Sequence, residues 1–242
     1  MSDQDHNDAD AQLLRDLNSS PLNPLPGVVW MLVLVVLGVE VALSAAGYGL
    51  IGGPQGVGWR LSAIQRFGFS SGIQGWMLET RQFPPQHLLR YLTFPFIHGS
   101  PMHALFGIVL LAALGKMVGE RFGALRFLAL ALGVPIVAAV IFGLVLGDDQ
   151  LGWLFGAMPM VFALVGGMTW LRWRDAGGDR DKQRRAFGLI AVLMGARLAF
   201  GLIAETGPAW IAELSAFALG FGASALVLGP GSWQRLRAKI RA

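Results

Sequence analysis

Residues 90–123 read RYLTFPFIHGSPMHALFGIVLLAALGKMVGERFG, and this stretch decides how the rest of the chain is interpreted. It joins an irregular segment, rich in aromatic residues and proline, to an apolar run typical of a helix. His98 and His103 stand at the junction. A histidine at the mouth of an apolar span is costly unless it faces a polar cavity. The stretch therefore predicts a polar site at one end of a membrane helix, with other helices packed around it.

The composition is typical of an integral membrane protein. Of the 242 residues, 54% are hydrophobic and 14% are charged, and the mean hydropathy is +0.55. Soluble domains carry about a quarter charged residues. Apolar runs of roughly 20 residues recur, which is the length that an α-helix needs to cross about 30 Å of hydrocarbon. Because a helix satisfies its own backbone hydrogen bonds, we expect an all-α bundle.

Six apolar runs are predicted to span the membrane, and together they form one membrane domain, residues 27–228. The expected spans are residues 27–50, 103–119, 125–146, 153–171, 186–204 and 209–228. A long first loop, residues 52–89, separates the first two spans. Its mixture of aromatic and basic residues favours the membrane interface. A half-apolar loop of this length is unusual and is often functional.

Polar tails flank the membrane domain. Residues 1–26 are acidic, carry prolines at their end and lack the basic start of a signal peptide. We expect a disordered cytosolic tail there, with a short docking segment as the alternative. Residues 229–242 form a basic tail.

The distribution of basic residues predicts the orientation. With the N-terminus inside, fourteen Lys and Arg residues lie on the cytosolic side and four lie outside. The positive-inside rule therefore places both termini in the cytosol. These charges are expected to meet anionic lipid, so no nucleic-acid partner is predicted.

Several blocks of the chain resemble the rhomboid family of intramembrane serine proteases. The matching residues are RYLT at 90–93, His98 and MHALF at 102–106 in the second span, VFALVG at 161–166 in the fourth, and Ala212, Ala216 and Gly220 in the sixth. The resemblance implies a polytopic six-helix rhomboid-like bundle with a long amphipathic first loop. It also implies a place in the bacterial cytoplasmic (inner) membrane.

The residues that the family uses for catalysis are largely replaced. The resemblance implies a serine nucleophile in the fourth span, a histidine base in the sixth, and a histidine and an asparagine on the oxyanion side in the second. The equivalent positions here are Met158, Glu213, His103 and Gly107. A thioether has no proton to lose, so Met158 is not an acyl-transfer nucleophile. Met158 and Pro159 are instead expected to fill the cavity that a serine and water occupy in an active enzyme.

Other polar residues are candidates for client contacts or for structural roles: Glu40, Arg90, His98 and Arg197. Glu40 lies inside the first span, where a carboxylate either has a function or is hydrogen-bonded toward the bundle. Glu213 has to be neutral, paired or hydrated for the same reason. We expect Glu213 to pair with Arg197 or to bond to His103.

Relocated catalysis would need a different geometry. The fourth span has no serine, and all four histidines precede the third span. A Ser215 or Ser224 nucleophile would therefore have to be served by His103 from another direction. His98 and His103 are five residues apart with Pro101 between them, so they do not form an i, i+4 metal-binding pair. The chain has no cysteine, and no metal or cofactor is predicted.

Together these observations predict a rhomboid-fold pseudoprotease that binds the transmembrane segments of other proteins without cutting them. The expected partners are the lipid bilayer and those client segments. One alternative is an active intramembrane serine endopeptidase with relocated catalytic residues. Another is a small transport role, which would require one continuous polar path lined by Glu40, His103, Arg197 and Glu213.

Overall fold

The computed structural model describes residues 25–147, 152–203 and 207–229. Almost all of the acidic tail and all of the basic tail except residue 229 lie outside these residues. The described part is helical apart from one short antiparallel pair, β1 (Phe69–Ser70) with β2 (Trp153–Leu154). The prediction of an all-α fold is confirmed, and the small ladder is an addition to it.

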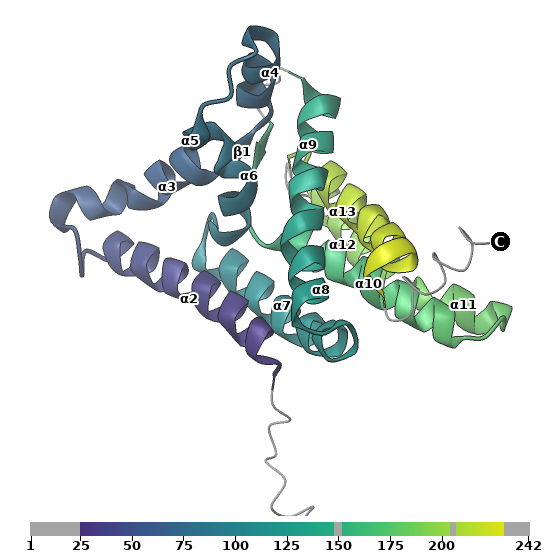
Figure 1. Ribbon diagram of the computed structural model, residues 1–242. Coiled ribbons are helices and arrows are strands. Elements are labelled where there is room, and N and C mark those ends of the chain that lie inside the picture. The colour runs from purple at the N-terminus through teal and green to yellow at the C-terminus, as the bar shows by residue number, and fades with distance from the viewer. Residues whose placement is uncertain (1–24, 148–151, 204–206, 230–242) are drawn as a thin grey trace, which may run out of the picture.

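The helices follow one another along the chain and build the bundle shown in Figure 1. Their bounds are α2 (Gly27–Gly47), η1 (Gly53–Gly58), α3 (Trp59–Phe67), α4 (Ser71–Thr80), α5 (Pro85–Leu88), α6 (Arg90–Thr93), η2 (Phe94–Phe96), α7 (Pro101–Phe122), α8 (Ala124–Leu128), η3 (Ala129–Gly133), α9 (Val134–Leu146), α10 (Met158–Asp175), α11 (Arg180–Ala186), α12 (Gly188–Ile203), α13 (Trp210–Ala223) and η4 (Ser224–Leu228).

Within the described residues, three helices are long and apolar enough to cross a membrane: α2, α7 and the continuous helix Ala124–Leu146 formed by α8, η3 and α9. They correspond to the first three predicted spans. A shorter apolar helix covers Trp210–Leu226. The chain is therefore an integral membrane protein.

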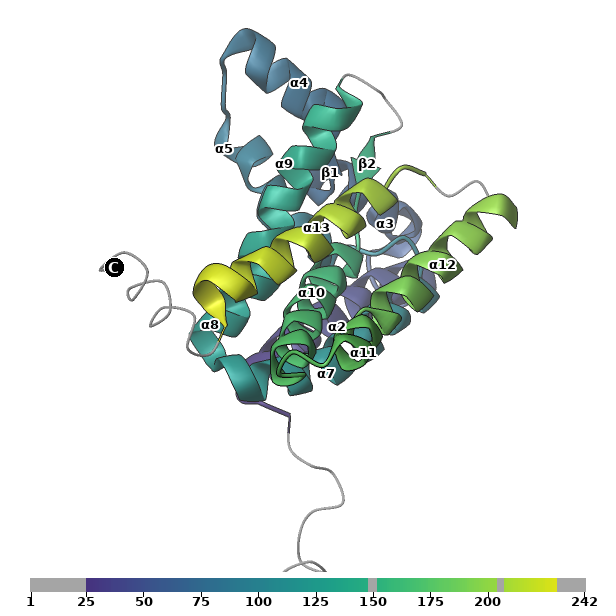
Figure 2. The same cartoon turned by 90° about the vertical axis from the view of Figure 1, so that its right-hand side faces the viewer.

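Helix α10 is the centre of the bundle. Every residue from Pro159 to Leu171 is buried. A helix that is apolar all round needs neighbours on every side, and α10 packs against α7, α13 and η3. In Figure 2, α13 lies across α10, and α12 runs along the edge of the bundle. The first turn of α10, with Met158, therefore lies among the other helices.

The start of α10 differs from the prediction. The expected fourth span began at residue 153, but Trp153 and Leu154 form β2 and the helix begins at Met158. Between them, Gly156 has φ +98°, a conformation that costs glycine little and other residues more. Pro159 lies in the first turn of the helix, as expected, where its missing N–H breaks no helical bond.

Small residues allow α13 to approach α10 closely. Ala212, Ala216 and Gly220 are buried along α13, at the four-residue spacing seen in the sequence. A Cβ added at Gly166 would overlap the Phe217 carbonyl oxygen, and one added at Gly220 would overlap the Ala163 carbonyl oxygen. Close backbone approach of this kind is a main source of helix association in lipid.

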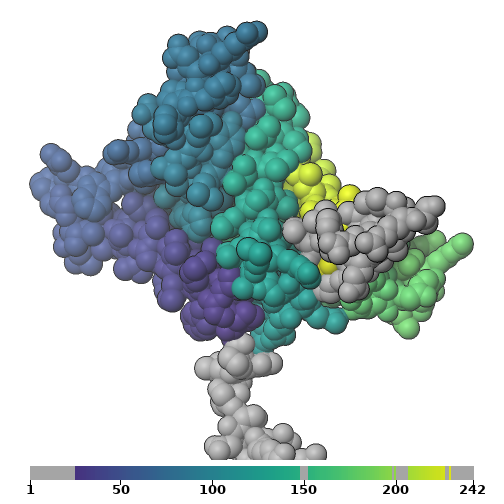
Figure 3. All heavy atoms as spheres, in the orientation of Figure 1, coloured from purple at the N-terminus to yellow at the C-terminus, as the bar shows by residue number. Residues whose placement is uncertain are grey.

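The first loop folds into short helices that are tied to their surroundings. Arg90 Nη1 donates to the Gly68 carbonyl oxygen at 2.8 Å, and Thr93 Oγ1 donates to the Phe67 carbonyl oxygen at 2.8 Å. The β1–β2 ladder joins the same loop to the segment before α10. In Figure 3 the blue atoms of the loop form one mass against the green atoms of α9. Arg90 therefore holds the C-terminal end of α3.

The α10–α13 contact leads to a stability prediction. We expect Gly166→Ala to destabilise the protein by about 2 kcal/mol or more, because the new methyl group meets backbone atoms that cannot rotate away. Thermal unfolding in detergent checks this. Gly38→Ala is the matched control, since nothing lies within 4 Å of a Cβ built at Gly38. Equal midpoints for the two variants would contradict the close packing.

Candidate functional site

One cavity of about 430 Å³ brings together residues that the sequence singled out. His103 from α7, Met158 from α10, Arg197 from α12 and Glu213 from α13 all line it. Trp153 and Phe155, from the segment before α10, also line it, as do Gly207 and Ala209. Met158 and Pro159 form part of the cavity wall, and their filling of the space of a serine and water stays a prediction.

Glu213 and Arg197 form an ion pair in this cavity. Arg197 Nε donates to Glu213 Oε2 at 3.1 Å, joining α12 to α13. The Glu213 side chain is 4% exposed and the Arg197 side chain is 26% exposed. A carboxylate at this depth is tolerated when it is paired. Of the two partners considered for Glu213, the structure gives Arg197.

His103 sits in the first turn of α7 and is placed by three contacts. The Ser100 side chain caps the helix by accepting the His103 backbone N–H at 3.2 Å. The imidazole lies edge-to-face on Phe155, with ring centroids 6.2 Å apart. A Cβ added at Gly156 would lie 2.6 Å from His103 Cε1 and Nε2. Glycine at 156 is therefore needed both for its backbone conformation and to leave room for this ring.

His98 lies behind the cavity and fixes the start of α10. It is 1% exposed, and its Nε2 accepts the Ala157 backbone N–H at 3.1 Å. Its ring meets the His103 ring edge-to-face, with centroids 5.0 Å apart. Because Nε2 accepts a hydrogen bond, the imidazole is neutral with its proton on Nδ1.

Gly107 does not face the cavity. A Cβ added there would lie 3.1 Å from Ala157 Cβ and 3.2 Å from His98 Nε2. Gly107, which the resemblance aligns with the family's asparagine, is thus packed against His98 and Ala157, which leaves little room for a side chain. Of the four positions that the resemblance aligns with the family's catalytic residues, three line the cavity: His103, Met158 and Glu213. The fourth, Gly107, is not among its lining residues.

Glu40 belongs to a separate polar cluster. Arg60, on α3, donates to both of its carboxylate oxygens, from Nη2 to Oε1 at 2.6 Å and from Nη1 to Oε2 at 2.9 Å. Ser44 Oγ donates to Glu40 Oε1 at 2.6 Å. Arg60 Nη1 also donates to the His98 carbonyl oxygen at 2.8 Å. This bidentate geometry is the strong form of a charged hydrogen bond.

The sequence did not identify Arg60 as a site residue, because it was assigned only to the membrane interface. A signal was present, since a carboxylate inside an apolar span needs a partner. Arg60 lies in an otherwise half-apolar loop, but the spacing of the two residues along the chain gives no sign that they meet.

The residues from 85 to 230 match the family model of the Rhomboid domain, which is more than half of the chain. The chain belongs to the rhomboid family. The resemblance inferred from short blocks is thereby confirmed as family membership.

Curated relatives include "Rhomboid protease GlpG" of Salmonella choleraesuis (strain SC-B67), which is 34% identical over 94 residues, and that of Salmonella newport (strain SL254), which is 33% identical over 94 residues. Each alignment covers 39% of this chain and 30% of the relative. The chain thus matches less than a third of the length of these relatives.

The environment of His98 leads to a pH prediction. Burial lowers the pKa of His98 from 6.5 to about 4, and the nearby His103 adds to the lowering. Between these two values the unfolded chain binds a proton at His98 that the folded chain does not bind. The contribution of His98 to the free energy of unfolding is therefore fully present above pH 6.5. It is lost as the pH drops toward 4, which lowers the free energy of unfolding by up to about 3 kcal/mol.

Thermal midpoints in detergent across this pH range measure the effect. The control is His98→Gln, whose amide oxygen can accept the Ala157 N–H without titrating. We expect the midpoint of this variant to depend less on pH than that of the wild type. Identical pH dependence of the two proteins would exclude His98 as the titrating group.

The Glu213–Arg197 pair leads to a second prediction. We expect Glu213→Gln to destabilise the protein by about 1–3 kcal/mol, because it leaves the Arg197 charge without a partner. The double variant Glu213→Leu, Arg197→Leu should recover part of this loss, since it removes both charges together. Glu120→Gln, at an exposed position on α7, is the control. A Glu213→Gln midpoint equal to that of wild type would show that the pair does not hold α12 to α13.

Proposed function

We propose that this chain is a rhomboid-fold pseudoprotease that binds the transmembrane segments of other membrane proteins without cleaving them. The observation that carries the proposal is the content of the cavity. A thioether stands at the nucleophile position, and a carboxylate engaged with Arg197 stands at the base position. None of the described residues that line the cavity carries a hydroxyl group.

Acyl transfer by a serine needs a hydroxyl within hydrogen-bond reach of a base. The candidates for a relocated nucleophile lie elsewhere. Ser215 lines a groove between α9 and α13, and Ser224 Oγ donates to the Gly220 carbonyl oxygen at 2.6 Å. Neither residue lines the cavity that holds His103. These positions favour binding over a relocated serine protease mechanism.

A transport role is less well supported than binding. It required four intramembrane polar residues to line a single path. His103, Arg197 and Glu213 share the cavity, but Glu40 does not line it and is bound to Arg60. The retained cavity, with its polar groups inside an apolar bundle, instead suits a client helix that carries a polar or helix-breaking residue.

The proposal includes the full membrane topology. The fourth and fifth spans are then α10, which is enclosed by its neighbours, and α12, at the edge of the bundle. With α2, α7, α8–α9 and α13 these give six spans over residues 27–228, flanked by the tails 1–26 and 229–242. Both termini lie in the cytosol of a bacterial cell, with the domain in the cytoplasmic membrane.

A paired assay on the purified, detergent-solubilised protein tests the proposed function. One arm incubates the protein with a model transmembrane substrate and with a fluorophosphonate serine probe. The other arm measures photo-crosslinking to the same substrate. We expect crosslinking without labelling or cleavage, with an active rhomboid protease as the positive control for both reactions.

A variant localises the crosslinking to the cavity. Ala209→Trp places a large side chain in the cavity lining and should lower the crosslinking yield, whereas Ala42→Trp on the exposed face of α2 should not. Serine labelling, with cleavage lost when that serine is replaced, would make the protein an enzyme. Absence of crosslinking, or equal crosslinking by the two variants, would overturn binding in this cavity.

A further inference from the structure

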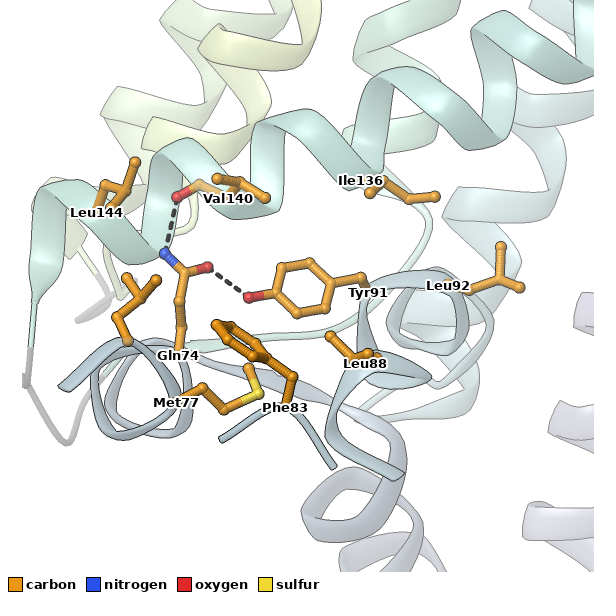
Figure 4. Close-up of a pocket in the computed structure, with 10 residues that line it drawn as sticks. Gln74, Met77, Phe83, Leu88, Tyr91, Leu92, Ile136, Val140 and Leu144 are labelled. Atoms are coloured by element: carbon orange, nitrogen blue, oxygen red, sulfur yellow. Dashed lines mark hydrogen bonds between the residues drawn. The ribbon is translucent and has the colours of Figure 1, made fainter. Parts of the chain in front are cut away.

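A second, apolar pocket of about 530 Å³ lies between the first loop and α9, away from the cavity described above. Figure 4 shows its two walls. Met77, Phe83 and Leu88 come from the first loop, and Val140 and Leu144 come from α9. All of these side chains are apolar, so the pocket offers a surface for hydrocarbon.

The two polar side chains in the pocket satisfy each other. Tyr91 Oη donates to Gln74 Oε1 at 2.7 Å, and Gln74 Nε2 donates to the Val140 carbonyl oxygen at 3.1 Å. Both bonds are drawn in Figure 4. Gln74 can lie this close to α9 because residue 143 is glycine, where a Cβ would lie 2.6 Å from Gln74 Cδ. The polar groups of Gln74 and Tyr91 are therefore hydrogen-bonded within the protein, which leaves a mainly apolar lining.

The position of the pocket on a membrane-spanning helix leads us to expect that it faces lipid. Its α9 wall belongs to Ala124–Leu146, one of the helices that are long and apolar enough to cross a membrane. The side chains at its rim remain accessible: Phe83 is 53% exposed and Leu144 is 62% exposed. Water gains little in a cavity without polar partners. We therefore expect a hydrocarbon chain, and not water, to occupy the pocket.

The size of the pocket selects the occupant. A single turn of α-helix, about 10–12 Å wide and about 5.4 Å high, itself takes up roughly 500 Å³. A client helix crossing the membrane has several turns, so only a small part of one could enter the pocket. A flexible acyl chain can enter such a space and leave its headgroup at the interface.

We propose that this pocket binds one acyl chain of a membrane phospholipid, which packs between the first loop and α9. The lipid then fills the space that the Gln74 bridge leaves open and completes the contact between loop and helix. This site is independent of the cavity that holds His103, and it stands whether or not the protein cleaves clients.

Photo-crosslinking in nanodiscs tests the proposal. The probe is a phosphatidylethanolamine with a diazirine on one acyl chain, and the labelled residues are mapped by mass spectrometry. We expect labelling concentrated on residues 77–92 and on α9. Val140→Phe narrows the pocket and should reduce labelling of residues 77–92 by about tenfold, because a packed site does not readily take up extra volume.

Two further variants make the result decisive. Val145→Phe is the matched control, since it adds the same side chain to α9 at a position that is 62% exposed and does not line the pocket. Leu88→Trp blocks the pocket from the opposite wall and covers the case in which Val140→Phe fails to fold. Equal labelling of all lipid-facing helices would show annular lipid only and overturn the site. The site is also overturned if lipid labelling of residues 77–92 in both blocking variants equals that in Val145→Phe. A transmembrane peptide that carries a diazirine is the second probe, and crosslinking of this peptide in place of the lipid at residues 77–92 would likewise overturn the site.

Discussion

One guanidinium group, that of Arg60, joins three separate segments of this protein. Arg60 binds both oxygens of Glu40 and the carbonyl oxygen of His98, so a single side chain joins the first membrane helix, the first loop and the segment before α7. His98 in turn accepts the backbone N–H of Ala157 at the start of α10. A charge at this depth is stable only with such partners. The hydrogen bonds of Arg60 and His98 thus position the start of α10, although neither residue lines the cavity.

Under the proposed function, the cavity stands where the family carries out its chemistry, but it holds different side chains. The glycine turn at 156 matches the first glycine of the family's motif, whereas Met158 and Pro159 depart from it. The side chains differ, since an ion pair now spans α12 and α13. A proton-transfer pair must be free to exchange its proton, whereas an ion pair between two helices mainly fixes their separation. Glu213, paired with Arg197, can therefore stabilise the contact between α12 and α13.

Much of the fold could be predicted because hydrophobic runs and short motifs are local signals. The long helices, the small-residue face at Ala212, Ala216 and Gly220, and the role of Pro159 were all readable in the sequence. The Glu40–Arg60 pair was not, because a salt bridge between distant residues leaves no periodic pattern. The strand at Trp153 was missed for a related reason: its partner lies in the first loop, and an apolar pair of residues also fits a helix.

The ladder between β1 and β2 gives the first loop a mechanical role. It links Phe69–Ser70 in the loop to Trp153–Leu154, and the chain then runs through Gly156 directly into α10. A displacement of the loop at β1 would therefore act on the backbone that leads into α10, and Trp153, Leu154 and Phe155 of that backbone line the cavity. The position of the first loop and the shape of the cavity are thus coupled through two backbone segments that are far apart in the sequence.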